Sequence, residues 1–331
     1  MREIGSEFWD VPIASKTNDL FPEKTQWYLS GRSALHAVIH DLGEVRSVSL
    51  PSWCCDSMIK PFIDAGLEVK FYPVFFNEGL VQEFAFDADI LFLMDYFGYT
   101  GVTPDLSGYE GIVIRDVTHS LFSASYHDAD YYFGSLRKWC GVWTGGYAWT
   151  KDGHKLDEGK IDIDYVSLRK QAMHEKGQYI DGRRNDKEYL KIFSDAEDLL
   201  EGMSVFQAAE RDIKVAYHLN VEEINDKRRA NAEVLRKAFS DWLIFSSTSP
   251  TDTPMFVPVL VPDGKRDELR RFLIKEEIYC PIHWPVSVYH RLNEKEQFSY
   301  DNELSLVCDQ RYTEEDMSRI VETINSFIGG N

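Results

Sequence analysis

The stretch FGSLRKW (residues 133–139), followed by a glycine pair at 145–146, carries the strongest signal in the sequence. Its apolar start predicts a strand that leads into a turn, where one amine, Lys138, stands near the hydroxyl of Ser135. A partly desolvated lysine amine is easily deprotonated and can attack a carbonyl carbon to form a Schiff base. The same pattern also fits a surface lysine whose stem lies on an aromatic ring, so the remaining sequence has to decide.

Apolar runs around this stretch predict strands that are buried on both faces of a mainly parallel sheet. They occupy residues 48–51, 69–74, 90–94, 112–114, 131–133 and 147–149. Helical spacing of apolar residues predicts a helix at 33–42, and another near 58–63. Ligands of such sheets bind at the carboxyl ends of the strands. Asp116 and Lys138 both follow a predicted strand and are therefore expected at that edge.

The second half of the chain predicts a different, smaller unit. Residues 151–202 are charged, have few apolar repeats, and predict broken helices and surface excursions. The elements expected beyond them are a long helical region over 205–235, strands at 242–245 and 255–261, a helix at 265–276, strands at 278–282 and 304–307, and a terminal helix over 313–327. The sequence thus predicts a large α/β domain with an N-terminal arm over residues 1–205, and a small α+β domain over 206–331.

Composition narrows the functional classes. The 331 residues carry 55 acidic and 36 basic side chains, a net charge of −19 that disfavours nucleic-acid binding. The N-terminus lacks an apolar signal region and no run of 18 apolar residues occurs, which disfavours secretion and membrane spanning. Five cysteines without paired zinc-type spacing are expected to be reduced thiols, which predicts a cytoplasmic protein without a metal site.

Residues 31–33, Gly-Arg-Ser, open the first predicted helix and suit a phosphate group. A helix N-terminus presents free backbone N–H groups and the positive end of the dipole to an anion. The side chains of Arg32 and Ser33 would add hydrogen bonds, and Gly31 would allow a close approach. A plain N-cap by Ser30 or Ser33 explains the same residues without a ligand.

Other residues match the remaining parts of pyridoxal phosphate. A carboxylate at Asp116 would keep a pyridine nitrogen protonated, so that the ring accepts electrons. His119 would contact the ring hydroxyl or the ring itself, Ser135 would reach the phosphate, and Trp53 or Cys55 would cover one ring face. Each has a structural alternative: an Asp116 bonded to backbone N–H groups or paired with its neighbouring arginine, a structural histidine, a core tryptophan, and a small buried cysteine.

Taken in order along the chain, these features closely resemble the DegT/StrS-type sugar aminotransferase family, whose members are pyridoxal phosphate enzymes of fold type I. The resemblance extends to residues 228–232, 278–285 and 304–312 and covers roughly 28–328, except for about 151–200. It implies a large mainly parallel-sheet domain, a small C-terminal domain, and a homodimer. It further implies the following roles: Lys138 as the aldimine lysine, Asp116 on the pyridine nitrogen, His119 near the ring hydroxyl, and Gly31, Arg32, Ser33 and Ser135 around the phosphate.

The sequence departs from the family pattern at three places. Phe133 stands where the family has a serine, five residues before the lysine, and Cys55 stands where an aromatic covers the ring, so that Trp53 is expected to take over. Residues 200–203, Leu-Glu-Gly-Met, lack the asparagine and arginine that many members lend to the partner subunit.

Several side chains are candidates to replace those missing groups. Arg183, Arg184 and Lys187 are candidate replacement cations, although a solvated charged face also explains them. His283 and Arg311 are candidates for substrate contacts or for structural roles.

The resemblance implies an aminotransferase that moves an amino group from glutamate to a nucleotide-linked keto-sugar through the internal aldimine of Lys138. Fold analogy does not identify the sugar. Two alternatives remain open on the same fold: a pyridoxal phosphate-dependent lyase or dehydratase, and a noncatalytic binding or regulatory protein. A cysteine hydrolase using Cys54 or Cys55 with His119 would leave Lys138, Asp116 and the helix start unexplained.

Overall fold

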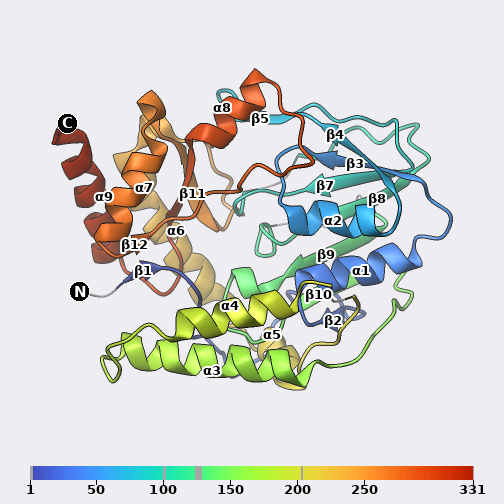
Figure 1. Cartoon of the computed structure of the whole chain (residues 1–331), viewed down its shortest axis with the longest axis horizontal. Coiled ribbons are helices and arrows are strands. Elements are labelled where there is room, and N and C mark those ends of the chain that lie inside the picture. The colour runs from blue at the N-terminus through green and yellow to red at the C-terminus, as the bar shows by residue number, and fades with distance from the viewer. Residues whose placement is uncertain (1–2, 100–101, 124–128, 203, 331) are drawn as a thin grey trace.

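The computed structural model describes residues 3–99, 102–123, 129–202 and 204–330. Within them a seven-stranded sheet forms the centre of the larger part of the molecule (Figure 1). In spatial order its strands are β2 (Gln26–Tyr28), β10 (Gly146–Thr150), β9 (Tyr131–Ser135), β8 (Ile112–Asp116), β7 (Ile90–Met94), β3 (Ser47–Pro51) and β4 (Glu68–Tyr72). Neighbours from β9 to β4 run parallel, whereas β10 is antiparallel to both β9 and β2.

The predicted α/β fold with a mainly parallel sheet is confirmed, because the apolar runs at 48–51, 90–94, 112–114, 131–133 and 147–149 all lie in this sheet. Helices α1 (Gly31–Asp41) and α2 (Asp56–Asp64) pack against each other, α1 on β9 and β10 and α2 on β4. The register of β8 on β9 pairs Asp116 with Phe133. The chain therefore leaves both strands at the same edge, as expected for parallel neighbours.

A smaller group of elements lies beside the sheet, at the end where both chain termini are found (Figure 1). It comprises α6 (Val221–Ala238), β11 (Phe256–Leu260), α7 (Arg266–Lys275), β12 (Ile278–Tyr279), α8 (Glu294–Asn302), β13 (Glu303–Val307) and α9 (Glu314–Gly329). The N-terminal strand β1 (Ile4–Gly5) pairs in parallel with β12. Helix α9 begins as predicted, with a capping box between Thr313 and Asp316.

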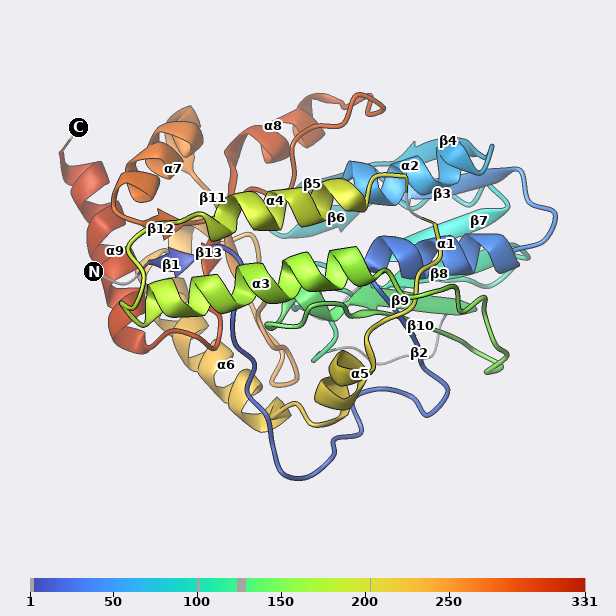
Figure 2. The same cartoon turned by 60° about the horizontal axis from the view of Figure 1, so that its bottom comes forward.

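Two long helices, α3 (Ile163–Ile180) and α4 (Tyr189–Leu199), form an antiparallel hairpin that runs from the termini towards α1 (Figure 2). The prediction of broken helices over 151–202 is therefore wrong. The helical pattern is hidden because the buried face of α3 includes charged side chains: Arg169 and Lys176 are fully buried. Lys176 pairs with the buried Glu3 of the N-terminal arm at 3.0 Å, and Arg169 with Glu7 at 3.3 Å.

Other boundaries differ from the prediction in ways that local contacts explain. The helical region predicted over 205–235 is interrupted between α5 (Glu210–Tyr217) and α6, because the Asn220 side chain caps α6. The strand predicted at 242–245 is a short 3-10 turn followed by one bridge from Leu243 to Val259. The run 69–74 divides between β4 and a small antiparallel pair, β5 (Val74–Phe76) and β6 (Leu80–Gln82).

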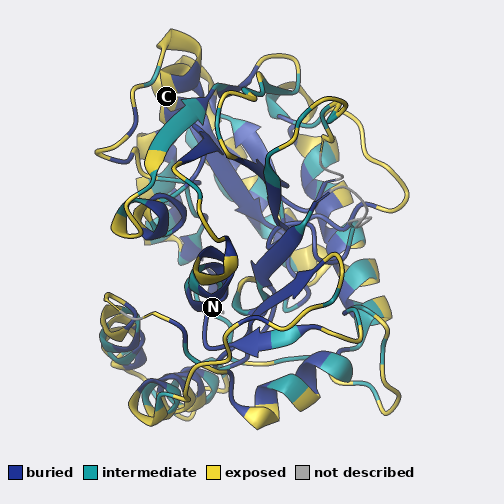
Figure 3. Ribbon diagram, turned by 90° about the vertical axis from the view of Figure 1, so that its right-hand side faces the viewer, coloured by how far each residue is buried: buried dark blue, intermediate teal, exposed yellow. Residues whose placement is uncertain are grey.

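Two large apolar clusters account for most of the core. One surrounds the seven-stranded sheet, whose strands are mostly buried apart from the edge strand β4 (Figure 3). The other joins α6, α7 and α9 to β11 and β13, and includes Ile4 of the N-terminal arm. A division at residues 205 and 206 remains a prediction. Among the described residues, no helix is long and apolar enough to cross a lipid bilayer.

Candidate active site

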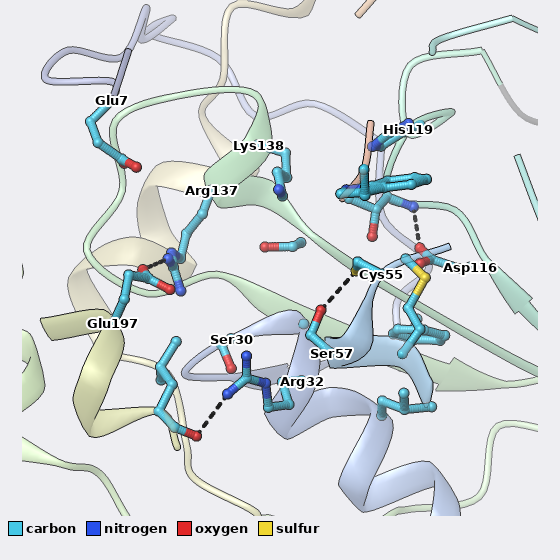
Figure 4. Close-up of a pocket in the computed structure, with 18 residues that line it drawn as sticks. Glu7, Ser30, Arg32, Cys55, Ser57, Asp116, His119, Arg137, Lys138 and Glu197 are labelled. Atoms are coloured by element: carbon cyan, nitrogen blue, oxygen red, sulfur yellow. Dashed lines mark hydrogen bonds and ion pairs between the residues drawn. The ribbon is translucent and has the colours of Figure 1, made fainter. Parts of the chain in front are cut away.

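A cavity of about 330 Å³ opens at the carboxyl ends of β8 and β9, beside the start of α1 (Figure 4). We call it the first cavity. Its lining brings together seven of the nine predicted site residues: Gly31, Arg32, Cys55, Asp116, His119, Ser135 and Lys138. These side chains come from four separate segments of the sequence. The parallel register of the sheet and the packing of α1 against β9 are therefore what assemble the site.

The start of α1 faces the first cavity as a helix N-terminus. Ser30 caps the helix, because its side chain accepts a hydrogen bond from the Ser33 backbone at 3.1 Å. A Cβ added to Gly31 would stand 3.1 Å from the Ser135 side chain, so α1 lies directly against the end of β9. On the far side, a Cβ on Gly146 would meet the Ser30 carbonyl oxygen at 1.9 Å. Glycine at 146 is thus required for α1 to approach the strand that follows Lys138.

Asp116 lies at the end of β8, buried, with one carboxylate oxygen bonded and the other without a partner. Oδ1 accepts a hydrogen bond from the Thr118 backbone at 2.7 Å, while Oδ2 has no hydrogen-bond partner in the described part of the chain. Arg115 points to the other face and pairs with Asp95 at 2.6 Å, which removes it as a partner for Asp116. Burial raises the pKa of Asp116 to about 6, although the Thr118 hydrogen bonds lower it.

His119 lies deep in the same cavity as a neutral imidazole. Burial, together with the charge of Lys138, lowers the pKa of His119 to about 3. The Phe97 backbone N–H donates to Nδ1 at 3.2 Å, so Nδ1 must be the unprotonated nitrogen. The proton therefore resides on Nε2, which makes that nitrogen a hydrogen-bond donor.

Lys138 ends a short 3-10 turn (Leu136–Lys138) that directly follows β9. The turn is anchored on both sides, because the Leu136 backbone donates to Gly145 at 2.7 Å and the buried Trp139 indole donates to the Thr118 carbonyl at 2.6 Å. The Lys138 side chain itself is exposed, in contrast to the predicted partial desolvation. It also lines a second cavity on the side of the molecule where β12 and α7 lie.

Several charged and aromatic lining residues were not predicted from the sequence. Arg137 pairs with Glu197 near the end of α4, and Glu7 reaches the first cavity from the N-terminal arm (Figure 4). Burial raises the pKa of Glu7, but the nearby cations of Arg169 and Arg137 hold it below the ordinary value. Trp284 lines the cavity beside His119, with ring centroids 5.6 Å apart. Only Arg137 had a sequence signal, its position next to Lys138.

Two predicted site residues lie outside the first cavity. Trp53 is fully buried and packs on Phe76 and Tyr300, with ring centroids 4.8 and 4.2 Å apart. The hydroxyl of Ser33 donates to the Ser204 carbonyl oxygen at 2.8 Å and accepts from the Phe206 backbone N–H. It therefore faces away from the first cavity. The structure therefore does not bring Trp53 or Ser33 to the first cavity, whereas Cys55 lines it beside Ser57.

The proposed replacement cations are also elsewhere. Arg183 pairs with Asp181, Arg184 with three carboxylates, and Lys187 with Glu3 and Glu277, all at or near the hairpin turn between α3 and α4. Met203, part of the departure at 200–203, lies outside the described residues.

The two weaker candidates for substrate contacts occupy different places. His283 is buried, and its Nδ1 lies 2.8 Å from the Ser305 hydroxyl. It does not line the first cavity, whereas the next residue, Trp284, does. Arg311 lines the second cavity.

Solved structures of sugar aminotransferases match the chain over nearly its full length. CalS13 from Micromonospora echinospora is 16% identical and superposes with a TM-score of 0.59, covering 92% of this chain and 87% of that one. Spr1654 from Streptococcus pneumoniae, in its pyridoxal phosphate form, is 14% identical with a TM-score of 0.62, covering 96% and 92%. The chain has the fold of the sugar aminotransferases. It is fold type I, as the resemblance implied.

A DegT DnrJ EryC1 StrS aminotransferase from Brucella abortus matches as well, at 13% identity and a TM-score of 0.56, covering 92% of this chain and 85% of that one. No protein-family model matches the sequence, and no curated protein sequence matches it. At these identities the likeness establishes the fold. The activity of the chain has to be argued from its own residues.

Proposed function

We propose that this chain is a pyridoxal phosphate-dependent aminotransferase that moves an amino group from glutamate to a keto-sugar linked to a nucleotide. The observation that carries the proposal is the buried Oδ2 of Asp116, which has no partner in the described structure and lines one cavity with Lys138. A buried carboxylate oxygen without a partner is costly unless a ligand donor completes it. A protonated pyridine nitrogen is such a donor.

The other lining groups fit the same cofactor. Ser30, Gly31, Arg32 and Ser135 would hold the phosphate at the N-terminus of α1. Arg32 is only partly engaged, since its Nη1 donates to the Leu200 carbonyl at 3.0 Å and its buried Nε has no partner among the described residues. The Nε2–H of His119 would donate to the ring hydroxyl oxygen. No aromatic residue stands at the position of Cys55, and the aromatic residues that line the cavity besides His119 are Phe133 and Trp284.

When bound, pyridoxal phosphate supplies the electron sink that stabilises a substrate carbanion. The protein groups then have separate tasks. Oδ2 of Asp116 would accept the hydrogen bond of the ring nitrogen and keep that nitrogen protonated. Nζ of Lys138 would hold the cofactor and, as a free amine, would take a proton from the substrate carbon and deliver it as a general acid to the cofactor carbon. His119 stays neutral and orients the ring.

The substrate class rests on the structural comparisons, in which sugar aminotransferases recur. A lyase or dehydratase on the same fold would use the same cofactor contacts, so one measurement has to separate them. Glutamate converts the bound cofactor of an aminotransferase stoichiometrically into its amine form and is released as its oxo acid. A lyase or dehydratase leaves glutamate unchanged.

The primary test is an absorption spectrum of the purified protein with added pyridoxal phosphate, followed by borohydride reduction and peptide mapping. We expect a new visible band and a covalent pyridoxyl label at Lys138, both lost in Lys138→Ala. Lys60→Ala is the matched control, because Lys60 lies exposed on α2, where it pairs with Asp64. Labelling at another lysine would overturn the assignment of Lys138, and no band in the wild type would overturn both enzyme hypotheses.

A homodimer is the quaternary structure that we propose on the basis of the resemblance. An exposed apolar segment next to the first cavity supports it: Val286, Val288 and Tyr289 are 46%, 79% and 39% exposed, directly after Trp284. Sedimentation velocity at micromolar concentration is expected to show a dimer, and Val288→Asp is expected to shift it towards monomer. A monomeric wild-type protein with bound cofactor would contradict the proposal.

A further inference from the structure

A second cavity of about 350 Å³ shares Lys138 with the first as a lining residue. Its walls come from the N-terminal arm, α6, α7 and the strands β11, β12 and β13, elements that gather around β1 (Figure 1). Lys138 lines both cavities and is the one described residue that does so. The two cavities therefore adjoin at the residue whose amine the proposed function requires.

The second cavity is strongly cationic in a strongly anionic protein. Among the described residues that line it, four carry a positive charge, Lys138, Arg228, Arg270 and Arg311, and a single one, Asp309, is acidic. The whole chain has a net charge of −19. A local excess of positive charge inside low-dielectric walls attracts an anion and raises its local concentration.

Two of the arginines are fixed parts of the wall. Arg311 pairs with Asp309 at 2.8 Å and donates to the Ser6 and Glu7 carbonyls of the arm, at 3.2 and 3.0 Å. Arg228 is buried over the Trp139 ring and donates from Nε to Gln310 at 2.7 Å. These contacts hold the arm and the turn after Lys138 in place, and they leave recognition of a ligand to another group.

Arg270 is that group. It lies half-buried on α7, and its Nε donates to the Cys280 carbonyl at 3.2 Å, which fixes the plane of the guanidinium. Its two terminal amino groups have no hydrogen bond or ion pair within the described structure. A guanidinium with free terminal N–H groups matches a carboxylate in a bidentate, planar arrangement.

The rest of the lining limits the ligand to a small carboxylate with a short hydrocarbon body. Apolar side chains from the arm and from three other elements complete the wall: Phe8, Met255, Phe256, Ile274 and Val307. The cavity's volume of about 350 Å³ is sufficient for a four- or five-carbon acid. Apolar contacts beside a charged fork also favour a carboxylate over inorganic phosphate.

We infer that the second cavity binds the carboxylate of the amino donor and of its 2-oxo product, with Arg270 as the recognising residue. The inference rests on the proposed function, because it is Lys138 that connects this cavity to the cofactor. The donor would then approach Lys138 from the second cavity while the cofactor occupies the first. The amine of the donor would then meet the cofactor carbon to which Lys138 is bound and would displace Lys138 from it.

Isothermal titration with glutarate, a five-carbon dicarboxylate without an amino or oxo group, tests the inference without turnover. We expect Arg270→Gln to weaken glutarate binding by about 10- to 100-fold, the range for losing a hydrogen bond to a charged group. Arg271→Gln is the matched control, since Arg271 is the next residue of α7, exposed and outside the cavity. Arg270→Lys keeps the positive charge but lacks the planar guanidinium. Its glutarate affinity is expected to lie between those of the wild type and Arg270→Gln, with an unchanged melting temperature.

Three results would overturn the inference: wild-type glutarate affinity in Arg270→Gln, equal losses in both variants, or displacement of glutarate by equimolar inorganic phosphate. In the cofactor-loaded protein we expect Arg270→Gln to raise the KM for glutamate at least about tenfold, with a smaller change in kcat. Arg270-dependent glutarate binding without a cofactor band would uphold this site and refute the proposed function. A normal cofactor band with no glutarate binding would refute this site and leave the proposed function standing.

Discussion

The two cavities meet at Lys138 but are built in opposite ways. The first is built mainly from strand ends and helix termini, and residues of both charge signs line it: Arg32, Asp116, Arg137 and Glu197. The second consists of segments that are far apart in the sequence, and its charge is almost entirely positive. The first thus suits a zwitterionic cofactor with an anionic phosphate and a cationic ring. The second suits a plain anion.

Because the two cavities are built differently, substitutions around each should affect different steps: cofactor binding and chemistry, or binding of the donor. Groups around the first cavity should affect cofactor binding and chemistry and leave carboxylate binding unchanged. Groups around the second should affect the donor and the position of the N-terminal arm. Lys138 should affect both cofactor chemistry, through its reactive amine, and donor binding, through its positive charge. The following predictions separate these effects, beginning with the largest.

Lys138→Arg keeps the charge of the shared residue and removes its reactive amine. We expect single-turnover formation of the amine form of the cofactor from glutamate to slow by at least about 10²- to 10⁴-fold, the range for loss of a positioned acid–base group. Glutarate binding in the second cavity should stay within a few fold of the wild type. A turnover rate within tenfold of the wild type would show that Lys138 is not the proton-transfer group.

Asp116→Asn tests the first cavity alone. Loss of the charged acceptor should lower turnover by about 10²- to 10³-fold, as for other preorganised electrostatic groups, with glutarate affinity unchanged. Because burial raises the pKa of Asp116 to about 6, the carboxylate needed by a protonated ring nitrogen is present above that pH. Cofactor affinity, followed by absorbance between pH 5 and 8, should therefore fall below pH 6 in the wild type, and the variant should lack this step.

The comparison also explains what the sequence could predict. Asp116, Lys138 and the Gly31 helix start are local features, each set by the end of a strand or the beginning of a helix, and parallel pairing brings such ends together. Glu7, Glu197 and Arg270 reach the cavities from distant segments without any local motif. Sequence alone therefore outlined the first cavity, and of the second it indicated only Lys138 and the candidate Arg311.

Side-chain direction was the other quantity that the sequence did not specify. Trp53 and Ser33 lie close in the chain to true lining residues but face the core and the segment after Ser204. The direction of the Trp53 ring depends on Tyr300 of α8, and that of the Ser33 hydroxyl depends on the Phe206 backbone N–H. The hairpin of α3 and α4 was missed for a related reason, because its buried face is partly ionic and gives no apolar period.

Asp309→Asn tests the wall of the second cavity. It removes the carboxylate that pairs with the buried Arg311, and breaking a buried pair costs about 3–5 kcal/mol of unfolding free energy. Arg311 also binds the arm, so limited proteolysis should cut near residue 10 faster in the variant. Asp181→Asn, which breaks an exposed pair with Arg183, is the control and should cost at most about 1 kcal/mol. Equal stability of Asp309→Asn and the wild type would refute this role.

Glu303→Gln tests a buried group behind the first cavity, where Glu303 accepts from the His283 backbone at 2.7 Å and from the Ser305 hydroxyl at 2.6 Å. Burial raises the pKa of Glu303 to about 8, against the effect of these bonds. Between its ordinary pKa and pH 8, the folded chain therefore keeps a proton that the unfolded chain releases, and stability falls as pH rises.

We expect urea unfolding of the wild type to lose up to roughly 1.4 kcal/mol per pH unit from this residue between pH 5 and 8, whereas Glu303→Gln should have a flatter profile. Asp301→Asn, an exposed carboxylate two residues away on α8, should leave the wild-type slope intact. The His283 ring lies 5.5 Å from the His119 ring, so the same titration should appear in the cofactor spectrum and be absent from glutarate binding. A pH-dependent change in glutarate affinity that disappears in Glu303→Gln would show that the two cavities are coupled through this buried group.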